Sequence, residues 1–161
     1  MNVVLVSPEI PPNTGNIARL CLAAGASLHL IRPLGFSLDD KYLKRAGMDY
    51  WQHVDLHIWD NLEACQSASA PEANWWYLTT KTKRIYHQAA FGKNDYLVFG
   101  RETKGLPESL LAENAERCLT IPMQPIARSL NLATSVGIVL YEALRQTESE
   151  SGAHLSGSHS L

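Results

Sequence analysis

The sequence predicts an α/β fold, in which a mostly parallel sheet carries helices on both faces. Short strand-like apolar runs alternate with helical segments along nearly the whole chain. The helical segments repeat their apolar residues at three- and four-residue intervals, which is the spacing of one buried stripe. The 161 residues are 45% hydrophobic and 19% charged, as expected for one compact domain. Alternation of this kind indicates parallel strands covered by helices on both sides.

The first elements are a strand at Asn2–Ser7 and the helix that follows it. The run Pro11-Pro12-Asn13 interrupts the strand pattern, and we expect the helix to begin at about Thr14. Gly25 is a suitable stop, because glycine readily adopts the left-handed conformation that ends many helices. The apolar positions of this helix share one face and are Ile17, Leu20, Cys21 and Ala24.

The alternation continues through the middle of the chain. We expect a strand at Ser27–Ile31, a short basic helix at Asp39–Ala46, a strand near His53–Trp59 and a helix near Asn61–Ala68. In the second half, strands are predicted at Trp75–Thr79, Tyr96–Phe99 and Cys118–Ile121, with one helix after Pro107 and a last helix from about Asn131 to Gln146.

The last helix carries an apolar stripe that either packs on the sheet or faces a second subunit. After it the chain becomes rich in serine, glycine and histidine, and it has too little apolar surface to order itself. We therefore expect residues 1–146 to form a single domain and residues 147–161 to form a disordered tail.

Composition excludes several classes of protein. The three cysteines are odd in number and widely separated, so neither a disulfide framework nor a zinc site is indicated. The net charge of −2 argues against a generic polyanion binder, although the basic clusters at residues 41–45 and 81–84 leave a one-sided RNA-binding face open. We find no leader or membrane-spanning run, and we expect a cytoplasmic protein without membrane contact.

Most common catalytic signatures are absent. His53 and His57 have a metal-like spacing, but they lie on a predicted strand together with Asp55, so we expect no metal. The serines lack the nucleophile elbow of hydrolases. Gly100 and Gly105 are spaced like the glycines of a phosphate-binding loop, yet Leu106 and the proline after it stand where lysine and serine or threonine are required.

Two motifs, at residues 99–107 and 121–132, each join a predicted strand to a helix. Between them they contain apolar strand ends, glycine, exposed backbone and a few polar side chains, from which a pocket for a small organic cofactor is made. Without phosphate-binding residues, such a pocket suits a ligand held by its purine, its ribose and its apolar edges.

These motifs resemble those of a known family. The segments 8–21, 33–36, 39–41, 78–81 and 139–143, together with the two motifs above, are similar to the SPOUT-type tRNA 2'-O-ribose methyltransferases. Within that family the resemblance is to the small tRNA (cytidine/uridine-34)-2'-O-methyltransferases. It covers nearly the whole chain. The sequence departs from the family pattern at Arg101, Thr82 and Leu130, where relatives commonly have proline, glycine and methionine.

The resemblance implies an S-adenosylmethionine-dependent homodimer with a C-terminal trefoil knot. It assigns catalysis to Arg19, within the motif Asn13-x5-Arg19, and to Asn131. It implies no metal. The positions that match the cofactor shell are Leu78, Thr79, Gly100, Gly105, Ile121, Met123, Ser129 and Leu130.

The expected substrate is the anticodon stem-loop of tRNA, methylated on the ribose of nucleotide 34, with leucine tRNAs as the expected targets. Two alternatives remain open at this point. One is ribose methylation at another tRNA or rRNA position, and the other is a non-catalytic RNA-binding module on the same scaffold.

Overall fold

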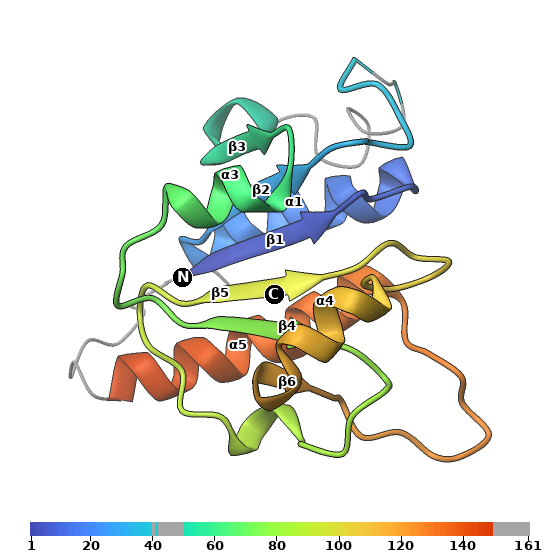
Figure 1. Cartoon of the computed structure of the whole chain (residues 1–161). Coiled ribbons are helices and arrows are strands. Elements are labelled where there is room, and N and C mark those ends of the chain that lie inside the picture. The colour runs from blue at the N-terminus through green and yellow to red at the C-terminus, as the bar shows by residue number, and fades with distance from the viewer. Residues whose placement is uncertain (40, 42–49, 150–161) are drawn as a thin grey trace, which may run out of the picture.

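The computed structural model describes residues 1–39, 41 and 50–149 (Figure 1). Its centre is a six-stranded sheet in the order β3-β2-β1-β5-β4-β6, with every pair of neighbours parallel. The α/β prediction is therefore confirmed, and the sheet is wholly rather than mostly parallel. The strands are β1 (Asn2–Val6), β2 (Ser27–Ile31), β3 (Leu56–Trp59), β4 (Trp75–Leu78), β5 (Tyr96–Phe99) and β6 (Cys118–Leu119).

Helices cover both faces of this sheet, as predicted. On one face α1 (Pro11–Ala24) packs against α5 (Leu132–Ser149), and together they bury a core that includes Leu5 and Leu97. On the other face α3 (Leu62–Ser67) and α4 (Glu108–Glu113) cover a second cluster around Tyr77. Figure 1 shows α3 and α4 in front of the strands and α1 and α5 behind them. No described helix is long and apolar enough to cross a membrane.

The strand order reverses direction between β1 and β5. From β1 the chain first adds β2 and β3 on one side, and it later places β5, β4 and β6 on the other. In open parallel sheets, such a reversal leaves a crevice at the carboxyl ends of the strands, because the loops there diverge. The fold therefore predicts a ligand site among the loops after β1, β4, β5 and β6.

Helix α1 begins at Pro11, three residues before the predicted start at Thr14. Proline is tolerated in the first helical turn because its missing N–H has no partner there in any helix. Gly25 ends the helix in a left-handed conformation with φ of 63°, which confirms the predicted stop. The basic helix predicted at Asp39–Ala46 falls largely on residues 40 and 42–49, outside the described residues.

Strands β1 and β4 end one residue before the predicted ends, and β3 and β6 are shorter than predicted by more than that. The segment Trp51–His53 forms a 3-10 turn, and β3 begins only at Leu56. The three polar residues at 53, 55 and 57 therefore do not line one strand face, and His57 stacks on His29 with ring centroids 4.8 Å apart. Strand β6 stops at Leu119, because the next residue, Thr120, forms a bridge with Ile85 instead.

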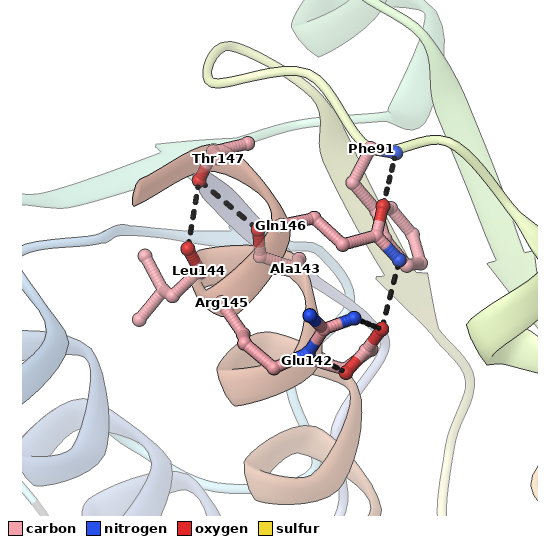
Figure 2. Close-up of polar contacts among 7 residues, drawn as sticks. All are labelled: Phe91, Glu142, Ala143, Leu144, Arg145, Gln146 and Thr147. Atoms are coloured by element: carbon pink, nitrogen blue, oxygen red, sulfur yellow. Dashed lines mark hydrogen bonds and ion pairs between the residues drawn. The ribbon is translucent and has the colours of Figure 1, made fainter. Parts of the chain in front are cut away.

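The last helix extends further than predicted, to Ser149 rather than Gln146 (Figure 2). The hydroxyl of Thr147 is buried and donates to the carbonyl of Ala143 at 3.0 Å, so residues 147–149 are not part of a disordered tail. Gln146 accepts a hydrogen bond from the Phe91 backbone N–H at 3.0 Å, which fastens the helix to the loop before β5. Residues 150–161 lie outside the described part of the chain.

A neutral histidine is built into the sheet at β2. His29 is 5% exposed, and its Nδ1 accepts a hydrogen bond from the Trp59 indole at 3.1 Å. The proton must then sit on Nε2, where it is donated to Asn2 Oδ1 at 3.1 Å. Burial and the neighbouring His57 lower the pKa of His29 from about 6.5 to about 4, against a smaller opposing effect of Asp55.

We expect this histidine to make the protein less stable in mild acid. The unfolded chain binds a proton at His29 near pH 6.5 and the folded chain only near pH 4. Stability should therefore be full above pH 6.5 and fall as the pH drops towards 4, by up to about 3 kcal/mol. Denaturant unfolding between pH 7 and pH 5 measures this slope.

The matched comparison is His29→Gln against His53→Gln, because His53 is exposed. The first variant should lose much of the slope and the second should keep it. Glu142 does not interfere, since its hydrogen bond from Arg145 lowers its pKa to about 2 and confines its own contribution to more acidic conditions. An unchanged slope in His29→Gln would show that the histidine titrates normally in the folded chain.

Candidate functional site

A cavity of about 530 Å³ opens at the carboxyl ends of β4, β5 and β6. Its wall comes from segments 78–81 after β4, 99–106 after β5, 120–123 after β6 and 128–132 at the start of α5, with Ile10 and Asn13 from the first helix region. The size suits one small organic molecule, because ligand pockets are typically about 300–1,000 Å³. The site therefore forms where segments that are distant in the sequence converge.

Every residue assigned to the cofactor shell lines this cavity. Leu78, Ile121 and Met123 supply apolar surface, and Thr79 and Ser129 supply hydroxyl groups. The remaining assigned positions that line it are Gly100, Gly105 and Leu130, and the cavity also includes Asn131. The residues that the family resemblance assigned to the cofactor shell therefore lie around one cavity in the fold.

Arg19 lies apart from this set. It is exposed on α1 and does not line the cavity, and its guanidinium carbon lies 5.0 Å from the centre of the Tyr50 ring. Within one chain, the predicted catalytic arginine and the predicted cofactor residues are thus separate.

The loop after β5 depends on two glycines that meet. A Cβ atom on Gly100 would lie 2.0 Å from the carbonyl carbon of Gly105, closer than any side chain permits. Gly105 has φ of 67° and donates its N–H to the Arg101 carbonyl at 2.8 Å, which closes a tight turn. The glycine pair therefore shapes this part of the cavity wall through backbone packing, not through phosphate binding.

Glu102 ties the loop after β5 to the start of α1. Its carboxylate accepts hydrogen bonds from the backbone N–H groups of Glu9 and Ile10, at 2.9 and 3.0 Å, and from Asn13 Nδ2 at 3.3 Å. The tie is reciprocal, since the Glu9 carboxylate accepts from the backbone and hydroxyl of Thr103 at 3.2 and 2.8 Å. Hydrogen bonds to a carboxylate are stronger than neutral ones, so these contacts hold the two loops firmly together.

Asn131 joins the same network from the third loop. Its Nδ2 donates to Asn13 Oδ1 at 3.0 Å, and its Oδ1 accepts from the Thr134 backbone at 3.2 Å. Asn13 therefore connects Glu102 on one side with Asn131 on the other. The resemblance placed residues 100–106 in the cofactor shell, but no pattern in the sequence indicated that Glu102 and Thr103 bind the segment of Glu9, because only the pairing of β1 with β5 places the two loops side by side.

The described cysteines do not form an alternative catalytic centre. Burial raises the pKa of Cys21 to about 12 and that of Cys65 to about 11, so both thiols stay protonated and unreactive. Cys118 is also free and buried. Among the described residues, no group of three or more histidine, cysteine or acidic side chains is arranged to hold a metal ion.

Comparison with known proteins gives consistent results. A sequence model of the SpoU rRNA Methylase family matches residues 1–141. The chain is 51% identical, over 148 residues, to a tRNA (cytidine(34)-2'-O)-methyltransferase of Saccharophagus degradans, with 90% of this chain and 94% of that protein covered.

Two solved structures are similar over most of the chain. One, described as giving structural insights into the 2-OH methylation of C/U34 on tRNA, has 47% identity and a TM-score of 0.86, and it covers 94% of this chain and 97% of its own. The other is an AdoMet-bound rRNA methyltransferase from Sinorhizobium meliloti, with 29% identity and a TM-score of 0.78, covering 89% of this chain and 55% of its own.

We expect Glu102→Ala to loosen the junction between the two loops. The Glu9 and Ile10 amides would lose their acceptor, so their hydrogen exchange should become faster. Losing hydrogen bonds to a charged group should lower the free energy of unfolding by about 1–3 kcal/mol. Hydrogen exchange followed residue by residue, together with denaturant unfolding, measures both effects.

The control is Glu113→Ala, which removes an equally charged but exposed side chain on α4. It should change stability by no more than about 0.5 kcal/mol. Wild-type protection at Glu9 and Ile10 in Glu102→Ala would mean that the carboxylate does not hold this junction in solution.

Proposed function

The chain belongs to the SpoU rRNA methylase family, and from this premise we propose that it transfers a methyl group from S-adenosylmethionine to the ribose 2'-oxygen of nucleotide 34 in tRNA. The observation that carries the proposal is the cavity at the ends of β4, β5 and β6, where the residues assigned to the cofactor shell converge. Relatives that are about half identical over most of the chain are named as tRNA (cytidine(34)-2'-O)-methyltransferases, and this supports nucleotide 34 of tRNA, rather than rRNA, as the substrate.

The cavity fits S-adenosylmethionine. Leu78, Ile121 and Met123 offer apolar surface to the adenine and the thioether chain, while hydroxyl and backbone groups of the three loops can bind the ribose and amino acid ends. When bound, S-adenosylmethionine supplies an electrophilic methyl group, so the protein needs no covalent intermediate of its own. The work left to the chain is to position the two reactants and to stabilise charge.

We assign Arg19 to the RNA. A guanidinium donates hydrogen bonds in a planar fork and accepts none, so it suits a phosphate and an oxygen that becomes negative. We assign Asn131 to positioning, because its amide is engaged by Asn13 and by the start of α5 while the residue borders the cavity. The nearby positive charge then favours the loss of the 2'-hydroxyl proton to solvent water as the oxygen takes up the methyl group.

We further propose that the active form is a homodimer. Arg19 lies outside the cavity of its own chain, and a second copy related by two-fold symmetry would carry its own Arg19 to the first chain's cavity. Exposed apolar side chains near these regions, Ile10 and Ile126, are available to be covered by such a partner. The trefoil knot implied by the family resemblance and a cytoplasmic location, where tRNA is used, belong to the same proposal.

We expect methylation to map to the wobble nucleotide. In tRNA from cells that lack this protein, mass mapping should show the loss of ribose methylation at nucleotide 34, with leucine tRNAs as the expected targets. Adding purified protein and S-adenosylmethionine to that tRNA should restore it. Loss of methylation at another tRNA or rRNA position would keep the reaction and overturn the substrate.

Cofactor binding provides the independent check. S-adenosylhomocysteine at 100 times its dissociation constant should stabilise the protein by about 2.7 kcal/mol, whereas ATP and NAD should not. Binding of cofactor and tRNA without methyl transfer to any tRNA would favour the alternative of a non-catalytic RNA-binding module.

Subunit complementation tests the role of Arg19. Arg19→Ala should abolish turnover while leaving S-adenosylhomocysteine affinity unchanged, and Leu130→Trp should block the cavity with an indole ring. When equal amounts of the two inactive dimers exchange subunits, about half of the dimers are mixed, and each mixed dimer has one intact site out of two. The mixture should therefore recover about a quarter of wild-type turnover.

The control for complementation is the double variant in one chain mixed with wild type, because its mixed dimers hold no intact site. This mixture should show no gain beyond the wild-type dimers present. A monomer that is fully active at micromolar concentration, or Arg19→Ala with wild-type turnover, would contradict the assignment.

A further inference from the structure

A second cleft of about 470 Å³ adjoins the cofactor cavity. It lies against the loop after β5 and the start of α4, and its lining residues are Lys81, Arg101, Lys104, Gly105, Leu106, Pro107 and Glu108. Arg101, Lys104 and Lys81 also line the cofactor cavity, so the two spaces share a wall. A ligand that extends out of the cofactor cavity would enter this cleft directly.

The charge in this cleft is unbalanced. Lys81 is paired with Glu108 at 2.8 Å, which leaves Arg101 and Lys104 without a carboxylate partner among the described residues. The chain as a whole has more acidic than basic residues, 16 against 14, so this local excess of positive charge runs against its composition. Two unpaired cations beside a buried leucine, Leu106, form a site suited to an anion.

The two acidic side chains nearest this cleft are both engaged by other groups: Glu108 lines the cleft and pairs with Lys81, whereas Glu102 does not line it. The Glu102 carboxylate is occupied by the Glu9 and Ile10 backbone amides on the side of α1, and it does not line the cleft. Glu102 fastens the loop inward, while Arg101 and Lys104 face the cleft.

We propose that this cleft binds a backbone phosphate of the RNA substrate next to the nucleotide whose ribose enters the cofactor cavity. The inference rests on the proposed function, because a polynucleotide is the substrate that carries an anion at a fixed interval from the reacting ribose. Phosphate contacts set the position and register of a nucleic acid without reading its sequence. Arg101 and Lys104 are therefore positioning residues for the substrate.

The test is the salt dependence of tRNA binding by the full chain. The double variant Arg101→Ala/Lys104→Ala should weaken binding about tenfold near physiological salt, as expected when charge-assisted contacts are lost. The slope of log K against log salt should become shallower by roughly 0.7–0.9 for each phosphate contact removed. The affinity for S-adenosylhomocysteine should stay at the wild-type value.

Two matched variants separate this site from a general charge effect. Lys93→Ala removes an exposed lysine at the opposite end of β5 and should leave affinity and slope unchanged. Arg101→Lys in the otherwise wild-type chain keeps the charge and should keep the slope. Melting temperatures of all variants confirm that the comparison is between folded proteins.

Each outcome decides between the possibilities. If the double variant binds tRNA with the wild-type affinity and slope, or with the same change as Lys93→Ala, the cleft does not hold the RNA. If it loses S-adenosylhomocysteine affinity instead, the two cations serve the cofactor and the inference is wrong. If the unmodified protein methylates tRNA and the variants bind tRNA as it does, only this inference is wrong. If the unmodified protein neither binds nor methylates tRNA, the proposed function is wrong as well.

Discussion

The Glu102 carboxylate is the contact on which the candidate site depends. It satisfies two backbone N–H groups at the entrance to α1 and one side-chain amide, that of Asn13, which in turn binds Asn131. Three loops that leave different strands are thereby held as one unit. A cavity built from loops needs such a constraint, because loops are otherwise the most mobile parts of a fold. The sheet fixes where the loops begin, and this carboxylate fixes how they meet.

The parallel sheet makes that meeting possible. β1 and β5 are neighbours although nearly a hundred residues separate them, so the loops after them leave the same edge side by side. The same arrangement divides the work of the loop after β5. Its glycines close a tight turn, Glu102 accepts hydrogen bonds from the start of α1, and Arg101 and Lys104 line the second cleft. This one short segment thus forms part of the cofactor cavity wall, holds it to the start of α1 and places two positive charges beside it.

Several sequence predictions failed for a common physical reason. The strand expected from His53 begins only at Leu56. Helix α5 continues past Gln146 because the Thr147 side chain is buried and its hydroxyl donates to the Ala143 carbonyl. Element ends are decided by which partner a residue meets in three dimensions. The polar pattern at residues 53–57 was compatible with a solvated strand face, yet His57 stacks on His29 from the neighbouring strand. Local pattern carries no information about such neighbours.

The amino-acid sequence alone predicted the class of the fold and the order of its strands and helices along the chain, because apolar periodicity is a local property. The resemblance of its motifs to the SPOUT-type methyltransferases pointed to residues that line the cavity. The sequence also excluded phosphate-loop chemistry, through Leu106 and Pro107. The strand order, the separation of Arg19 from the cavity, the Glu102 network and the cationic cleft are properties of the three-dimensional fold. Each of these depends on which distant segments become neighbours, and that choice is made by burying two apolar layers on a single sheet, not by any one stretch of residues.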